Sequence, residues 1–178
     1  MMSNQEQMIV LVDEHDQETG IMEKMEVHRK ALLHRAFSVF IFNSKGDMLL
    51  QRRALNKYHS GGLWTNTCCS HPFPGESVEM AAERRLVEEL GFETEVKFAF
   101  NFIYKAALDN ELTEYEFDHV LIGEYEGKLD LNKNEIGDYC YRSMEDISSD
   151  MSLHPKKYTA WFLIAFPMLE KYLSTNKS

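Results

Sequence analysis

The segment that decides the fold reads GESVEMAAERRLVEELGF and runs from Gly75 to Phe92. Ser77 is a favoured N-terminal cap of a helix, because its hydroxyl can accept a hydrogen bond from a free backbone N–H. No glycine or proline follows until Gly91, a favoured residue just past a helix end. We therefore predict a helix over residues 78–90 with a loop on either side.

The charged residues of this helix form a second pattern. Arg85 and Glu89 are four positions apart and share a helix face, so a guanidinium and a carboxylate can flank one phosphate group. The order Gly-Glu followed by Arg-x-x-x-Glu-Glu-x-Gly resembles the Nudix box, a loop–helix–loop whose glutamates bind divalent metal on a diphosphate. The alternative for an acidic helix is a solvated face with ion pairs, which the spacing of the glycines and glutamates disfavours.

The match to the box departs at one position. Where the box has Arg-Glu, this chain has Arg84-Arg85, so one metal-binding glutamate is replaced by arginine. A Nudix hydrolase assembles metal ions on a carboxylate cluster to activate water, and the loss of one carboxylate argues against diphosphate hydrolysis. We expect a retained scaffold with changed chemistry.

Outward from the helix, apolar and turn patterns predict several strands and a second helix. The expected elements are strands over 8–12 and 36–42, a turn over 43–47 with 48–51 as the return arm of a hairpin, a loop over 54–62 before a short strand within 63–72, strands over 95–104 and 116–123, and a helix over 157–173. Strands mixed with two or three helices indicate an α/β (α+β) fold. Together with the box, the pattern predicts a Nudix-like mixed β-sheet sandwiched between helices.

The composition limits the partners of this chain. Its 178 residues fit a single domain over 1–178 with polar tails at 1–7 and 174–178. The net charge is 19 − 29 = −10, so we expect no nucleic-acid or membrane partner. We also expect a monomer or weak homodimer. An anionic substrate must then be bound by placed cations or by metal.

The ends and the cysteines indicate a cytoplasmic protein. The first seven residues, MMSNQEQ, are polar where a signal peptide needs an apolar run, and no stretch reaches the roughly 18 apolar residues that span a bilayer. Cys68 and Cys69 are adjacent and Cys140 makes an odd count, which argues against a disulfide framework.

Three further segments resemble the type I isopentenyl diphosphate isomerases. They are Leu-His-Arg-Ala-Phe-Ser at 33–38, Trp-Thr-Asn-Thr-Cys-Cys-Ser-His-Pro at 64–72 and Glu-Tyr-Glu at 114–116, in the family's order, with 23–24, 51–53 and 161 also in step. The resemblance covers roughly positions 8 to 165. It implies a Nudix-like fold and the interconversion of isopentenyl and dimethylallyl diphosphates, an allylic and homoallylic pair, in isoprenoid biosynthesis.

Histidines and carboxylates predict a metal site. Three imidazoles and two carboxylates suit zinc or manganese better than calcium, and Glu114 and Glu116 share one side of a strand. A lone histidine is more often structural or solvated, and sequence cannot show that these residues converge. The resemblance implies one ion, Zn²⁺ or Mn²⁺ (or Mg²⁺), on His28, His34, His71, Glu114 and Glu116.

A second metal ion follows from the Nudix-like helix. The resemblance implies Mg²⁺ held by Glu89, the substrate's diphosphate and a backbone carbonyl near Cys69. No Gly-x-Gly-x-x-Gly fingerprint is present, so we expect neither flavin nor nicotinamide, which disfavours the unrelated flavin-dependent isomerases.

Moving a double bond by one carbon requires a strong acid on one side of the substrate and a base on the other. The resemblance assigns this antarafacial proton transfer, through a tertiary carbocation, to Cys69 and Glu116, with Tyr104 beside Glu116. Which of the two is the acid depends on direction. Strand alternation points Cys68 to the opposite face from Cys69, so Cys68 and Cys140 are expected to pack as small buried residues.

Because the protein is acidic overall, individual cations must bind the diphosphate of the substrate. The resemblance assigns this role to Lys24, Arg53, Lys57 and Arg85, and places Trp161 over the allylic cation, where its ring contributes about 0.5–2 kcal/mol. The alternatives are solvated lysines and a tryptophan that only packs in the core. The competing functions are a Nudix-type nucleotide pyrophosphohydrolase and a non-catalytic binding domain, which the cysteine, histidines and acid/base residues disfavour.

Overall fold

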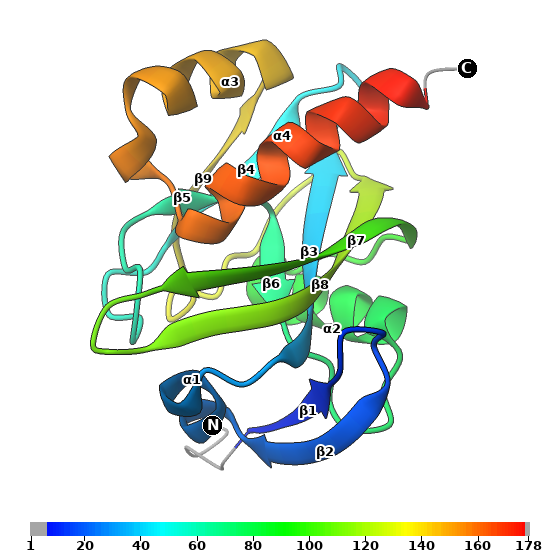
Figure 1. The fold of residues 1–178 in the computed structure, drawn as a ribbon. Helices are drawn as coiled ribbons and strands as arrows, with labels where there is room; N and C mark the ends of the chain where they lie inside the picture. Colours follow the sequence, from blue (N-terminus) through cyan, green and yellow to red (C-terminus); the bar gives the residue numbers. More distant parts are fainter. Residues whose placement is uncertain (1–6, 177–178) are drawn as a thin grey trace.

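The computed structural model describes residues 7–176 of the chain (Figure 1). In chain order its elements are β1 (Met8–Val12), β2 (Glu18–Glu23), α1 (Lys24–Lys30), β3 (His34–Phe42), β4 (Met48–Arg53), β5 (Trp64–Thr65), β6 (Cys68–Ser70), α2 (Val78–Leu90), β7 (Val96–Ala107), β8 (Thr113–Glu124), β9 (Ile136–Arg142), α3 (Met144–Leu153), the 3₁₀ turn η1 (Pro155–Lys157) and α4 (Ala160–Thr175).

Strand β3 is the centre of a nine-stranded mixed sheet. It runs parallel to β8, in register from His34 with Glu116 to Phe42 with Glu124, and β7 pairs antiparallel with the far side of β8. On its other side β3 pairs antiparallel with β6, where Ser38 lies opposite Cys69. The strands that carry His34, Cys69 and Glu116 are therefore direct neighbours.

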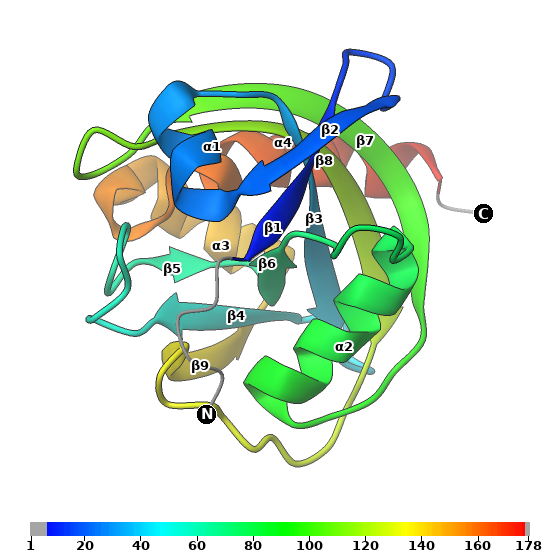
Figure 2. The same ribbon diagram turned by 90° about the horizontal axis from the view of Figure 1, so that it is seen from below.

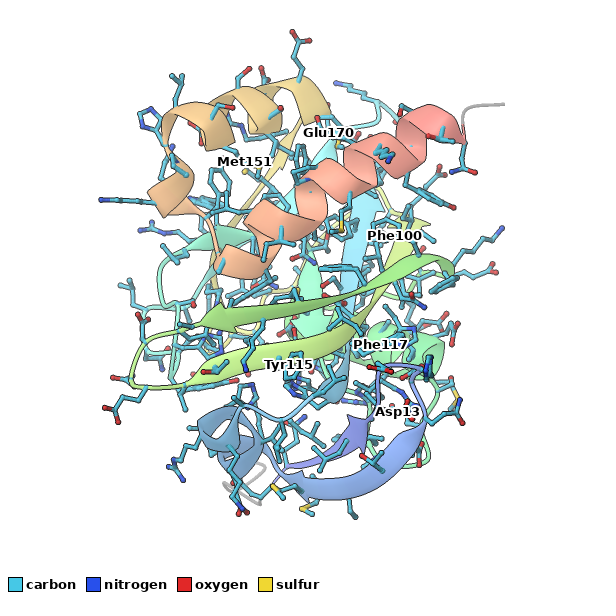
Figure 3. The ribbon with its side chains drawn as sticks, viewed as in Figure 1. Asp13, Phe100, Tyr115, Phe117, Met151 and Glu170 are labelled. Carbon is cyan, nitrogen blue, oxygen red and sulfur yellow. The ribbon has the colours of Figure 1, made fainter. Side chains whose placement is uncertain are left out.

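The two faces of the sheet are covered by different helices (Figure 2). Val39 and Ile41 of β3 pack in the cluster that includes α2, whereas Phe40 packs with α4. Phe100 of β7, labelled in Figure 3, extends the second cluster. Its ring centroid lies 5.5 Å from that of Tyr172. Burial of each such apolar side chain stabilises the fold by about 1.5–3 kcal/mol. The mixed sheet between helices confirms the predicted fold class.

Helix α2 begins and ends where its sequence predicts. The Ser77 hydroxyl accepts a hydrogen bond from Met80 N at 3.2 Å, and Gly91 closes the helix with φ = 74°. A Cβ on Gly91 would lie 2.7 Å from Cβ of Asp130, because the segment after β8 folds against this helix end. Asp130 N donates to Leu90 O at 2.9 Å, so the glycine serves both the helix and the loop that approaches it.

The predicted hairpin over 36–51 is only partly correct. The turn forms, with Asn43 N donating to Asp47 O at 3.0 Å, but β3 and β4 pair only at Phe42 and Met48. Strand β4 then diverges and pairs with β9 and β5 instead. The last helix starts at Ala160 and not at 157 as predicted, because η1 occupies residues 155–157 and Thr159 caps the helix. Over residues 7–176, no helix has the length and hydropathy of a membrane span.

Candidate active site

A cavity of about 120 Å³ opens between α1, the β4–β5 loop, α2 and the start of β8. Its lining includes ten of the predicted site residues: Lys24, Arg53, Lys57, Cys69, His71, Arg85, Glu89, Glu114, Glu116 and Trp161. The other three, His28, His34 and Tyr104, lie behind this wall in contact with Glu114 or Glu116. The structure thus brings together side chains from positions 24 to 161.

The five residues His28, His34, His71, Glu114 and Glu116 form one buried group, which we call the histidine end. His28 Nε2 contacts Glu114 Oε1, and Glu116 Oε2 lies 3.0 Å from His71 Nε2 and 3.4 Å from His34 Nε2. Four of the residues, all except Glu116, each offer a ligand atom within 4.8 Å of the others.

Backbone carbonyls orient two of these rings. His28 Nδ1 donates to Lys24 O at 2.6 Å and His34 Nδ1 donates to Leu32 O at 2.9 Å, which turns both Nε2 atoms toward the carboxylates. A neutral imidazole then presents a lone pair to a carboxylate, which is unfavourable unless a cation lies between them. His34 Nε2 and His71 Nδ1 are buried without a hydrogen-bond partner. This donor set fits a divalent metal ion.

The histidine end also separates the proton affinities of its rings. Burial disfavours a charged His34, but the Glu116 carboxylate outweighs it and raises the pKa of His34. Burial, reinforced by the nearby His34, lowers the pKa of His71 well below its ordinary value. His71 is therefore neutral at physiological pH, the form in which imidazole binds metal.

Cys69 and Glu116 lie on neighbouring parts of the same sheet face. Tyr104 lies opposite Glu116 in the β7–β8 register and its hydroxyl donates to Glu116 Oε1. Burial, followed by the charge of Asp118, raises the pKa of the half-buried Cys69 thiol. Cys69 is therefore a thiol rather than a thiolate at neutral pH.

Cys68 faces the other way, as strand alternation predicts. Its side chain is fully buried in the cluster beneath α2, and its Sγ donates to Glu89 Oε2 at 2.9 Å. Cys68 is thus shielded from the cavity but holds one oxygen of a carboxylate that lines it.

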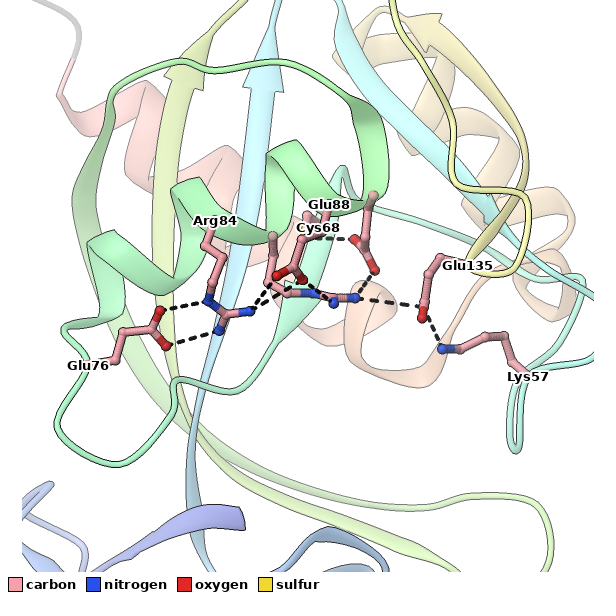
Figure 4. Close-up of polar contacts among 8 residues, drawn as sticks. Lys57, Cys68, Glu76, Arg84, Glu88 and Glu135 are labelled. Carbon is pink, nitrogen blue, oxygen red and sulfur yellow. Dashed lines mark hydrogen bonds and ion pairs between the residues drawn. The ribbon is translucent and has the colours of Figure 1, made fainter. Parts of the chain in front are cut away.

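The same cavity is also lined by four cations, which we call the cation end: Lys24, Arg53, Lys57 and Arg85. Two of these cations are paired with carboxylates. Lys57 Nζ lies 2.6 Å from Glu135 Oε2, a pair labelled in Figure 4. Arg85 Nη2 lies 2.8 Å from Glu89 Oε1. The same Arg85 nitrogen is 3.8 Å from Glu135 Oε2. Where the Nudix box has a glutamate, Arg85 therefore neutralises the carboxylates around it.

Arg84, the neighbour of Arg85 in the box, has a different role. It binds both oxygens of Glu76, at 2.7 and 3.0 Å, and so ties the loop before α2 to the helix (Figure 4). A bidentate pair of this kind fixes geometry. Arg84 is outside the cavity lining, so the two adjacent arginines divide into one loop clasp and one cavity cation.

Aromatic rings surround the remaining cations. Lys24 Nζ lies 4.6 Å from the ring centre of Tyr58, and burial with the nearby Lys57 lowers the pKa of Lys24 to about 8. The Arg53 guanidinium lies 5.2 Å from the Trp161 ring, whose other neighbour is the edge-on ring of His59 at 5.7 Å. Burial and Arg53 lower the pKa of His59 to about 3, so that ring is neutral.

The sequence analysis gave no role to several polar residues in or behind the cavity wall, among them Ser38, His59, Asn66, Asp118 and Glu135. Asp118 continues the two-residue spacing of Glu114 and Glu116, so that signal was present in the sequence. Burial and Glu116 raise the pKa of Asp118 well above its ordinary value. Ser38 and Asn66 lie within the segments at 33–38 and 64–72 that carry the resemblance, whereas His59 and Glu135 have no local pattern that separates them from other loop residues.

Comparison with known proteins identifies the family of this chain. A model of the NUDIX domain matches residues 32–162. Isopentenyl-diphosphate Delta-isomerase of Pectobacterium atrosepticum is 48% identical over 170 residues, covering 96% of this chain and 95% of that protein. Isopentenyl-diphosphate Delta-isomerase 2 of Photorhabdus laumondii is also 48% identical, over 88% of this chain and 89% of its own length.

Solved structures agree on the fold. The crystal structure of DR0079 from Deinococcus radiodurans superposes with a TM-score of 0.75 at 17% identity, covering 90% of this chain and 98% of that one. The MutT protein from Methanosarcina mazei gives a TM-score of 0.66 at 22% identity, covering 82% and 96%. The chain therefore belongs to the isopentenyl-diphosphate Delta-isomerase family, built on a NUDIX domain, in agreement with the resemblance of its motifs.

Proposed function

We propose that this protein interconverts isopentenyl diphosphate and dimethylallyl diphosphate in its cavity, with Cys69 and Glu116 as the two proton-transferring groups. The observation that carries the proposal is that one cavity is lined by the Cys69 thiol, the Glu116 carboxylate and four cations. A diphosphate bound at the cation end extends its short hydrocarbon tail toward Cys69 and Glu116.

The proton transfers follow from this placement. One group adds a proton to the terminal methylene carbon of isopentenyl diphosphate, whose π electrons form the new C–H bond and leave a tertiary carbocation. The other group removes a proton from the methylene carbon that joins the cationic carbon to the carbon bearing the diphosphate. The electron pair of that C–H bond becomes the new double bond. The two groups exchange roles in the reverse direction, so each must both give and take a proton.

Two side chains support these steps. The Tyr104 hydroxyl donates to Glu116 and holds one of its oxygens in place while the other faces His34 and His71. The Trp161 ring lines the cavity and is an attractive surface for a passing carbocation. Arg53 lies against the same ring, so the guanidinium and the indole support one another.

Metal ions complete the proposed site. His28, His34, His71, Glu114 and Glu116 would hold Zn²⁺ or Mn²⁺ (or Mg²⁺), which would fix the geometry of Glu116 and balance the carboxylate charge. Glu89 would share Mg²⁺ with the substrate's diphosphate, which would offset part of the substrate's negative charge. The remaining positive charge comes from the cation end, Lys24, Arg53, Lys57 and Arg85.

The decisive experiment follows isopentenyl diphosphate with Mg²⁺ in deuterated water by NMR, without flavin or nicotinamide. We expect dimethylallyl diphosphate with deuterium in its methyl group and deuterium exchange beside the diphosphate carbon, without phosphate release. Release of inorganic phosphate, or hydrolysis of a panel of nucleoside diphosphate derivatives, would instead support a Nudix-type pyrophosphohydrolase. Absence of label from both positions would contradict the isomerase proposal.

A further inference from the structure

Asn66 is a buried amide in the short connection between β5 and β6, 1% exposed. Its Nδ2 donates to two backbone carbonyls, Val39 O and Cys68 O, each at 3.0 Å. A side-chain amide has two N–H donors, and both are used here. The orientation of the amide is therefore determined by its surroundings, and Oδ1 must face the opposite direction.

That oxygen faces the thiol of Cys69. Cys69 Sγ donates to Asn66 Oδ1 at 3.0 Å, and Thr65 Oγ1 donates to the same oxygen at 2.9 Å. Thr65 in turn accepts a hydrogen bond from Thr159 Oγ1 at 2.9 Å, and Thr159 caps α4 two residues before Trp161. A chain of hydroxyl and amide groups thus connects the start of the helix that carries Trp161 with the sulfur.

Among the described residues, one other polar atom lies within hydrogen-bonding distance of this sulfur, and it is the more distant of the two. Ser38 Oγ lies 3.5 Å from Cys69 Sγ, and its own hydrogen is donated to Asp118 Oδ2 at 2.7 Å. Among the described residues the nearest acceptor for the thiol hydrogen is therefore Asn66 Oδ1, by half an ångström. The direction of the S–H bond is set by one amide.

We propose that Asn66 is a positioning residue for Cys69. This inference rests on the proposed isomerase function. Between turnovers the Cys69 thiol donates its hydrogen bond to Asn66 Oδ1, and this contact fixes the sulfur at the cavity wall. Rotation about the Cβ–Sγ bond then carries the hydrogen toward bound substrate without displacing the sulfur. Thr65 maintains the arrangement because its hydroxyl holds the same amide oxygen.

The amide also has a structural role, since Nδ2 joins the backbones of β3 and β6. The two roles can be separated by choice of variant. Thr65→Val removes the hydroxyl that holds Oδ1 and leaves both Nδ2 contacts intact. Thr67→Val is the matched control, because the Thr67 hydroxyl is equally buried in the same segment but bonds only to backbone, donating to Leu49 O at 2.6 Å and accepting from Ile41 N at 3.0 Å.

The kinetic test separates kcat from KM. For Asn66→Ala we expect kcat for isopentenyl diphosphate to fall about 100-fold with KM changed less than about threefold, because a misplaced reacting group costs rate more than binding. In Thr65→Val we expect kcat to fall as well, but to a smaller extent. Thr67→Val lowers the melting temperature but keeps kcat. If Asn66→Ala does not fold, the kcat of Thr65→Val tests the proposal instead. A lowered kcat supports the role of Asn66, and a native kcat contradicts it.

A spectroscopic test reads the thiol without turnover. The S–H stretching band of Cys69, assigned in the Raman spectrum by difference against Cys69→Ala, should shift to higher frequency in Asn66→Ala and stay in place in Thr67→Val. An unshifted band, or a kcat equal to that of the native protein, would overturn the role of Asn66. If the S–H band shifts in Asn66→Ala but the native protein does not isomerise isopentenyl diphosphate, the proposed function is refuted and the hydrogen bond between Asn66 and Cys69 is not.

Discussion

The two ends of the cavity are built in different ways. At the histidine end the side chains come from α1, β3, β8 and the residue after β6, and backbone carbonyls orient the rings of His28 and His34. At the cation end the side chains come from the ends of elements, from a loop and from α2, and Lys57 and Arg85 are paired with Glu135 and Glu89.

The difference indicates two kinds of ligand. Buried carboxylates and unpartnered ring nitrogens at the histidine end fit a cation that stays in place. Cations already paired with carboxylates at the other end fit an anion that comes and goes, because the internal carboxylates neutralise Lys57 and Arg85 whenever substrate leaves. Changes at the first end should therefore affect the chemical step, and changes at the second end should affect binding.

The largest effect is expected from the proton-transferring groups. Cys69→Ala and Glu116→Gln should each lower kcat by about 1,000-fold or more, since loss of a general acid or base removes one of the two proton transfers. Cys68→Ala is the matched control and should keep most of the activity, because Cys68 faces α2. A folded but inactive Cys68→Ala, with an active Cys69→Ala, would reverse the assignment of the two cysteines. Isomerisation is followed by NMR.

Metal content sharpens the comparison further. His71→Ala should weaken binding of the proposed divalent ion at the histidine end by about 100-fold or more, because it removes a nitrogen ligand of a buried site. Arg85→Ala should leave that ion in place. Elemental analysis after dialysis measures both variants, and loss of metal from Arg85→Ala would show that the two ends are not independent.

Arg85 itself tests the binding end. Arg85→Ala should lower kcat/KM by about 10–100-fold, mainly through KM, since hydrogen bonds to charged groups contribute about 1.5–3 kcal/mol. Arg84→Ala is the control: it breaks the clasp to Glu76 and should lower stability while KM changes little. A loss of kcat alone in Arg85→Ala would contradict the assignment of this residue to binding. Initial rates at varied substrate concentration distinguish these cases.

The pH dependence of binding follows from Lys24. Its pKa is lowered to about 8, so the ammonium group is present below pH 8 and is lost above it. We expect kcat/KM to fall by up to about tenfold as the pH rises through 8, because the free enzyme then lacks one cation for the diphosphate. Lys24→Arg should remove this fall, since arginine stays charged. A fall that persists in Lys24→Arg belongs to another group.

The smallest effect concerns the internal anion. Glu135→Gln removes the partner of Lys57 and should lower KM by about 1.5–5-fold, the range expected for a partly exposed ion pair. Titration with inorganic diphosphate should show the same gain in affinity. An increase in KM would mean that Glu135 positions Lys57 for the substrate instead of competing with it.

Local signals predicted some elements and missed others. The helix over 78–90 was predictable because Ser77 and Gly91 mark its ends. Helix α1 lacks both marks: its N-terminal cap is Glu23, whose carboxylate accepts from Met25 N and Glu26 N, and it ends at Ala31 with φ = 53°. Strand β9 contains Gly137 and Asp138, residues typical of turns, and is held by pairing with β4. Neither element has a pattern of its own.

The candidate site divides in the same way. The residues named from motifs gather in one cavity, but the motifs do not show why they meet. The meeting of Cys69 with Ser38, or of Tyr104 with Glu116, depends on strand register, which is set by tertiary pairing. Glu135 reaches the cavity from a segment without chemical motif. Buried polar residues such as Asn66 acquire their roles only from the neighbours that the fold supplies.

Gly91 joins two properties that are usually separable in a mutant screen. The segment that packs against Gly91 at Asp130 continues to Asn132, whose N–H donates to Glu89 O at 2.9 Å. It then reaches Glu135, the ion-pair partner of Lys57. A side chain at position 91 would strain the helix end and push this segment outward together with its carboxylate. Variants at this glycine are therefore expected to score as both unstable and altered in substrate affinity, although no atom of the residue lines the cavity.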